Sequence, residues 1–126
     1  ATLRLATPKI AIVKKPISYT STSGQLLNQK AMNICTRFFS MGKAHHAIPA
    51  TGAIALATGT CLAGTIPNLL ASKSTDENIT IAHAAGLMEL SISVSDELKV
   101  FDAKIHRTAR TLMRGEVLAR LKITSG

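Results

Sequence analysis

One uncharged stretch, Ala44–Ser72, constrains the fold more than any other part of the chain. Two histidines, two prolines and several glycines interrupt it, so it cannot be a membrane span. Its centre, Thr51–Leu62, reads TGAIALATGTCL and has no polar face. A helix of this kind must be surrounded by other protein. We therefore predict a buried helix over 51–62, capped by the Thr51 side chain and ended by Gly64.

The composition fits one domain built around such a helix. The chain has 126 residues, enough for a real core, and 46% of them are hydrophobic. Only 3% are aromatic and there is no Trp, so Ala, Ile, Leu and Val must form the core. The chain opens within a predicted strand, without an initiator Met or a signal-peptide layout. We expect residues 1–126 to be a single domain, the C-terminal half of a two-domain protein.

Three further segments have hydrophobic patterns that predict secondary structure. The β-branched run Pro8–Val13 predicts a strand. Residues 25–39 place apolar side chains near helical spacing, which predicts a second, amphipathic helix, and residues 41–50 then form a loop. Ile79–Val94 alternates as a strand does, with a break at Gly86, or forms a hairpin.

The C-terminal stretch is ambiguous from its residues alone. Residues 97–120 are rich in Ala, Leu, Lys, Arg and Glu, which favour one long helix. Their period-two alternation from Val100 to Thr108 also suits a strand, and Gly115 interrupts either structure. The pattern leaves both readings open.

The formal charge of +8 narrows the classes of partner. There is no dense basic block and almost no aromatic side chain to stack on bases, which disfavours nucleic acid and a membrane surface. A small anionic ligand, or only a solvated basic surface, fits better. Cys35 and Cys61 lie in apolar contexts without metal-ligand spacing, so we expect two buried free thiols and no metal site.

Two motifs are specific enough to indicate a family. They read SMGKAHHAIPATGA (Ser40–Ala53) and RTARTLMRG (Arg107–Gly115). In this order they resemble the C-terminal part of the methylaconitate cis-trans isomerases, methylitaconate delta-isomerases and oxalomesaconate tautomerases, which are related in fold to diaminopimelate epimerase. The likeness runs from Pro8 to about Leu118. Weaker motifs that support it are PKIAIV, SYTSTSG, AGTIP and ITIAHAAGLMEL.

The resemblance implies an α+β fold. Each of two similar domains would wrap a mostly antiparallel sheet around a central helix, here residues 51–62, with the active site between the domains. It also implies that residues 104–119 form a strand, against their helix propensity. The missing N-terminal domain would be the partner that carries the catalytic Cys and Lys. We expect a cytoplasmic protein that can form a homo-oligomer and binds neither nucleic acid nor membrane.

The function implied is a cofactor-independent isomerase or tautomerase that shifts a double bond in an unsaturated di- or tricarboxylate. Such enzymes remove and return a proton, so this half would bind the substrate carboxylates, partly at the helix N-terminus. The alternative is a non-catalytic anion-binding or interaction domain. Pro49 stands where the epimerases carry a catalytic cysteine, and His83 matches a family histidine. The expected substrate-binding residues are Lys43, His45, Thr51, Gly52, Ala53 and Gly86.

Overall fold

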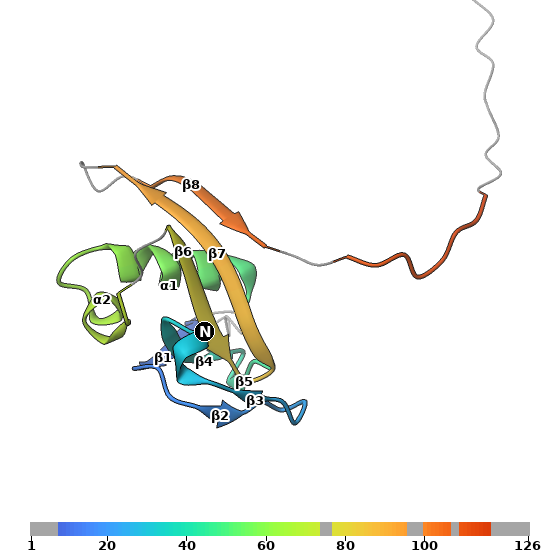
Figure 1. The fold of residues 1–126 in the computed structure, drawn as a ribbon, viewed down its shortest axis with the longest axis horizontal. Helices are drawn as coiled ribbons and strands as arrows, with labels where there is room; N and C mark the ends of the chain where they lie inside the picture. The colour runs from blue at the N-terminus through green and yellow to red at the C-terminus, as the bar shows by residue number, and fades with distance from the viewer. Residues whose placement is uncertain (1–7, 74–76, 96–99, 107–108, 117–126) are drawn as a thin grey trace, which may run out of the picture.

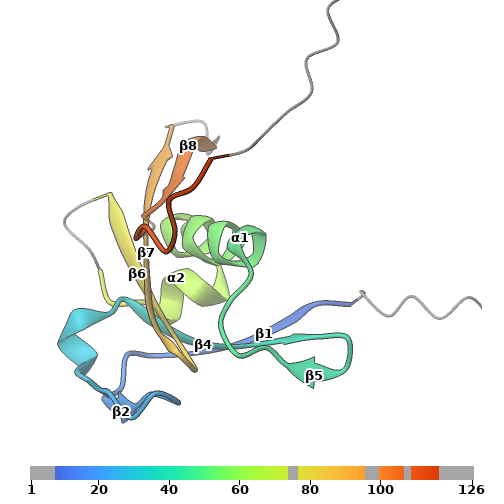
Figure 2. The same ribbon diagram turned by 90° about the vertical axis from the view of Figure 1, so that its right-hand side faces the viewer.

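The computed structural model describes residues 8–73, 77–95, 100–106 and 109–116. They form one twisted sheet with two helices packed on one face and a short β2–β3 hairpin beneath the other (Figures 1 and 2). The elements are β1 (Ile10–Lys14), β2 (Tyr19–Thr20), β3 (Leu26–Leu27), a 3₁₀ turn (Gln29–Ala31), β4 (Ile34–Ser40), β5 (Lys43–Ala44), α1 (Ala50–Cys61), α2 (Ile66–Leu70), β6 (Asn78–His83), β7 (Gly86–Val94) and β8 (Val100–Ile105).

The sheet is mostly antiparallel, as expected. Its strand order is β1-β4-β6-β7-β8, with β5 paired to β4. Only the β4–β6 pair is parallel, with Ile34 opposite Ile81. The crossover between these two strands contains α1 and α2, so both helices cover one face of the sheet. The α+β class predicted from the sequence is confirmed.

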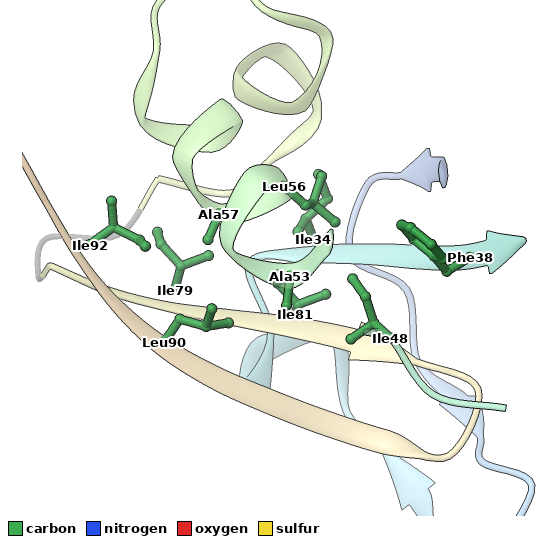
Figure 3. Packing of buried hydrophobic residues seen from close by; sticks show 10 residues of the cluster. All are labelled: Ile34, Phe38, Ile48, Ala53, Leu56, Ala57, Ile79, Ile81, Leu90 and Ile92. Atoms are coloured by element: carbon green, nitrogen blue, oxygen red, sulfur yellow. The ribbon is translucent and has the colours of Figure 1, made fainter. Parts of the chain in front are cut away.

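The core forms where α1 lies on the sheet (Figure 3). Ala53, Leu56 and Ala57 are buried against β-branched and leucine side chains of the strands. Because α1 presents mostly small residues to the sheet, its backbone can lie close to the strands. The strand residues of this cluster are Ile34, Phe38, Ile79, Ile81, Leu90 and Ile92.

The predicted central helix is confirmed, but its cap is wrong. The helix begins at Ala50, directly after Pro49, whose φ of −62° and ψ of 143° keep the chain extended. Proline has no side-chain acceptor, and Thr51 falls in the first turn, so α1 has no side-chain cap. In the described part of the chain α1 is also not enclosed on every side, since Thr51 and Ala55 are exposed.

The predicted amphipathic helix over 25–39 is wrong. The segment contains β3, the 3₁₀ turn and most of β4. Both faces of β4 are covered: Ile34 and Phe38 face α1, whereas Cys35 packs against the β2–β3 side. A strand buried on both faces lacks simple alternation, so its apolar residues mimicked helical spacing.

The predicted break at Gly86 is confirmed as a hairpin. β6 and β7 pair antiparallel, with His83 opposite Gly86 and Ala84–Ala85 between them. Gly86 has a φ of +155°, which L side chains rarely adopt. The predicted strand Pro8–Val13 is also confirmed, as β1.

The predicted strand over 104–119 is only partly correct. β8 pairs with β7 and ends at Ile105, and residues 109–116 form neither helix nor strand. This tail is exposed and leads away from the sheet (Figure 1). A strand needs a neighbour to bond with, and the tail has none among the described residues. Residues 107–108 and 117–119 lie outside the described residues. Among the helices described here, none is long and apolar enough to cross a membrane.

Candidate anion site at the N-terminus of α1

The first turn of α1 presents three backbone amides. Ala53 donates its N–H to the carbonyl of Pro49 at 2.9 Å, which closes the first intrahelical bond. The N–H groups of Ala50, Thr51 and Gly52 therefore precede the intrahelical bonding and, with the helix dipole, favour an anion. Of the expected residues Thr51, Gly52 and Ala53, Ala53 is buried and already uses its N–H in the bond to Pro49, whereas the amide of Ala50 precedes the intrahelical bonds.

Gly52 is required for packing. A Cβ built there would lie 2.7 Å from Cε2 of the Phe38 ring and 2.9 Å from its Cζ. Such distances are too short, so a larger residue would displace the ring from the core. The glycine thus lets the start of α1 approach β4 closely. This close packing explains the glycine without a ligand.

His83 lies at the end of β6 on the face that carries α1. It follows Ile81 by two residues, so both side chains point to that face. Only 7% of the residue is exposed, and its Nδ1 accepts the N–H of Ala85 at 3.2 Å. A neutral ring with Nδ1 as acceptor carries its proton on Nε2, which is then a hydrogen-bond donor.

The surroundings of His83 favour its neutral form. Burial lowers the pKa of the imidazole, and the nearby charges of Arg37 and His46 lower it further. His46 itself is exposed in the loop before α1.

The other expected residues, Gly86, His45 and Lys43, lie in three different parts of the structure. Gly86 faces His83 across the hairpin. His45 donates its backbone N–H to the carbonyl of Phe38 at 2.7 Å, and its exposed ring contacts Ala47 through Nδ1 at 3.0 Å. Lys43 pairs with Ser40 near the tip of the β4–β5 hairpin, which projects beyond the helices (Figure 2). Lys43 therefore belongs to this projecting hairpin.

Two residues near the site were not predicted. The Tyr19 hydroxyl donates to the carbonyl of His83, and the Arg37 guanidinium lies 5.0 Å from the centre of the Tyr19 ring. Tyr19 is 64 residues away from His83 in the chain, and nothing in a local pattern connects them. Arg37 lies just before the motif that begins at Ser40. This closeness in sequence is the one feature from which Arg37 could have been predicted.

The acidic residues are confined to one part of the sequence, whereas the basic residues occur throughout. Residues 1–75 contain eight Lys and Arg and no Asp or Glu, whereas residues 76–126 contain seven of each. The whole net charge of +8 thus lies in the stretch that includes α1 and the loop before it. The carboxylate nearest in sequence to the 83–86 turn, Glu89, pairs with Thr80 and points to the sheet face opposite His83. An anion at the N-terminus of α1 would therefore lie in a part of the chain whose charged side chains are all basic.

Both cysteines are free thiols; Cys35 is buried as expected, whereas Cys61 is only partly buried. In the described ranges, no group of three or more His, Cys, Asp or Glu side chains could hold a metal ion.

Comparison with known proteins identifies the group to which this architecture belongs. The chain is 37% identical over 120 residues to a 2-methyl-aconitate isomerase of Shewanella oneidensis, covering 93% of this chain and 30% of that protein. It is 31% identical over 114 residues to a 3-methylitaconate isomerase of Eubacterium barkeri, covering 89% and 30%. The chain thus spans about 30% of the length of these curated relatives.

The fold comparison agrees. The crystal structure of a methylitaconate-delta-isomerase matches with a TM-score of 0.77 and 30% sequence identity, over 89% of this chain and 29% of that one. The resemblance noted in the motifs and the expected epimerase-like fold are therefore confirmed. The PrpF protein family matches residues 1–120, nearly the whole sequence. This chain belongs to the PrpF protein family, whose named relatives are isomerases.

Proposed function

We propose that this chain is the C-terminal, substrate-binding domain of a longer isomerase. The enzyme would shift or reorient a double bond in an unsaturated di- or tricarboxylate by removing a proton and returning it. It would work in the cytoplasm without a metal or organic cofactor. The names of the relatives, 2-methyl-aconitate and 3-methylitaconate isomerases, support this class of substrate.

The observation that carries the proposal is the environment of the α1 N-terminus. The amides of Ala50, Thr51 and Gly52 come together with the dipole of a 12-residue helix. His83 lies at the same end of the core, buried and with Nδ1 already bonded to Ala85. No carboxylate occurs anywhere in residues 1–75. These features suit a small polyanion better than a cationic or neutral ligand.

The chemistry requires such a site. A proton next to a carboxylate or carbonyl is weakly acidic, and its removal leaves enolate-like charge on the oxygens. Amide donors and a neutral Nε2–H that are already in place can stabilise that charge without reorganising. The residues of this chain would therefore bind and polarise a carboxylate. The acid–base pair, a Cys and a Lys, is proposed to lie in the preceding domain.

Pro49 argues against a two-thiol mechanism for the proposed enzyme. The related epimerases use two thiols, one of them directly before the helix, but here that position is Pro49. Cys35 packs with the β2–β3 hairpin, and Cys61 ends α1 at the opposite end of the helix from its amides. A mechanism with one thiol from each domain therefore finds no candidate thiol at the helix N-terminus.

The test is an activity assay of the full-length protein that contains this chain. Incubation with 2-methylaconitate or methylitaconate in D₂O, with a metal chelator present, should give the isomer with deuterium incorporated at the carbon that is reprotonated. His83→Gln should lower kcat/KM by about tenfold or more if its donor contacts substrate charge. A folded full-length protein that binds tricarboxylates but isomerises none of them would instead establish the non-catalytic alternative.

A further inference from the structure

Tyr19 makes polar contacts with both ends of the β6–β7 turn. Its hydroxyl donates to the carbonyl of His83 and lies 3.4 Å from the carbonyl of Gly86. Those two residues face each other at the last position of the hairpin ladder. The turn between them is held from the same hairpin, because Thr22 donates its N–H to the carbonyl of Ala84 at 2.9 Å. The β2–β3 hairpin thus fixes the backbone from 83 to 86.

The Tyr19 ring is itself held in place. The Arg37 guanidinium lies over it at 5.0 Å, a cation–π distance, and the ring packs beside the small cluster of Leu27, Met32, Cys35 and Ala82. Burial raises the pKa of the Tyr19 hydroxyl. The hydroxyl therefore keeps its proton at neutral pH and stays a donor to the turn.

The backbone of this turn decides how the His83 ring is oriented. The ring accepts the N–H of Ala85 through Nδ1, and that N–H belongs to the turn that Tyr19 and Thr22 hold. If the turn shifts, the bond to Nδ1 weakens, and the imidazole can rotate or carry its proton on the other nitrogen. The donor at Nε2 would then be lost from the α1 side.

We propose that Tyr19 is a positioning residue of the anion site: through the carbonyls of His83 and Gly86 it holds the His83 imidazole with Nε2–H available to a carboxylate bound at α1. The role in binding rests on the function proposed above. The role in fixing the tautomer of His83 does not depend on any ligand, so the two can be tested apart.

The experiment uses this chain and its Tyr19→Phe variant, which keeps the ring under Arg37 and removes only the hydroxyl. Imidazole ¹⁵N chemical shifts report the tautomer of His83, and calorimetric titration with tricarballylate reports the affinity. We expect the wild type to show one tautomer, protonated on Nε2, and Tyr19→Phe to show a mixture with threefold to tenfold weaker affinity.

A control separates positioning from general loosening. Leu27→Ala damages the same small cluster but leaves the Tyr19 hydroxyl in place. At equal folded fraction it should leave both the tautomer of His83 and the affinity unchanged. The proposal is overturned if Tyr19→Phe keeps the wild-type tautomer, or if Leu27→Ala changes it equally. If the wild type does not bind tricarballylate at all, the proposed function fails, while the tautomer comparison still decides the role of Tyr19.

Discussion

The two parts of this chain share one sheet but differ completely in charge. Residues 1–75, which supply β1 to β5 and both helices, contain only basic charged side chains, whereas residues 76–126 are neutral overall. The described ion pair, Lys104 with Asp102 at 2.6 Å, lies in the neutral part. Within the basic part, the side chains described here bond largely to the main chain, as Thr36 does to the carbonyl of Ile12.

This uneven distribution of charge should lower the stability of the fold and favour the binding of an anion. Like charges gathered in one region repel each other and destabilise the compact state, while a neutral region avoids that cost. The basic region is also the one that contains the free amides of α1. We infer that the absence of carboxylates there serves anion binding, and the predictions below test this difference.

The largest effect is expected from one carboxylate placed at the α1 N-terminus. Thr51→Glu puts a negative charge beside the free amides, where it competes with a bound carboxylate. Tricarballylate affinity, measured by calorimetry, should fall about tenfold or more, because charge-assisted bonds of roughly 1.5–3 kcal/mol are lost. Stability should rise by about 0.3–1 kcal/mol, because the charge complements the helix dipole.

The matched control is Thr111→Glu, which adds the same charge on the exposed tail of the neutral part. It should change neither affinity nor stability. Equal loss of affinity in both variants would mean that only the total charge matters and that α1 is not the site.

The next effect concerns packing at the same place. Gly52→Ala brings a Cβ within 2.7 Å of the Phe38 ring and should destabilise the chain by about 1–3 kcal/mol in urea unfolding. Gly115→Ala in the tail meets nothing within 4 Å and should have almost no effect. In the double variant Gly52→Ala/Phe38→Leu, the loss of unfolding free energy should be smaller than the sum of the losses in the two single variants, since the two residues are in contact. Additive costs would show that the close approach does not matter.

The pH dependence of stability distinguishes two histidines of residues 76–126, the buried His83 and the exposed His106. The pKa of His83 is lowered in the folded chain, so as pH falls below about 6.5 the unfolded chain takes up the proton first and stability decreases. Above that pH the contribution is fully present. Urea midpoints between pH 5 and 8 should show this loss in the wild type and in His106→Gln, but less of it in His83→Gln. Identical profiles in all three would contradict the burial of a neutral His83.

Ionic strength should give the smallest effect. Between about 0.05 and 0.2 M salt, the Debye length shortens and surface charges are screened. Tricarballylate affinity should weaken a few-fold, while stability should rise slightly because repulsion within the basic part is reduced. A rise in affinity with salt would indicate that binding is driven by apolar contacts.

The sequence predicted those features that depend on local patterns. An apolar run with small residues indicated α1 to within one residue, and the alternation around Gly86 indicated the β6–β7 hairpin. It failed for β4, because burial on both faces removes the alternation that marks a strand. It failed for the tail beyond β8, where strand structure depends on a neighbour that residues 109–116 do not have in the described structure.

The site was predictable to a similar degree. Thr51 and Gly52 could be placed in the first turn of a helix because the apolar run predicts where that helix begins. Tyr19 and Arg37 were not predicted, because Tyr19 contacts His83 and Arg37 contacts the Tyr19 ring across long stretches of sequence. Lys43 was chosen from the motif, but its place in a projecting hairpin depends on the Met41–Gly42 turn, where both residues have positive φ.

The central claim, that the amides of Ala50, Thr51 and Gly52 bind a carboxylate, is tested most directly by backbone NMR. In a ¹H–¹⁵N titration of this chain with tricarballylate, those three amide signals should move together and saturate. The signal of Ala53, whose N–H is bonded to Pro49, should move much less. Saturating shifts confined to the exposed lysines, such as Lys14 and Lys15, or no saturating shift at all, would contradict the claim.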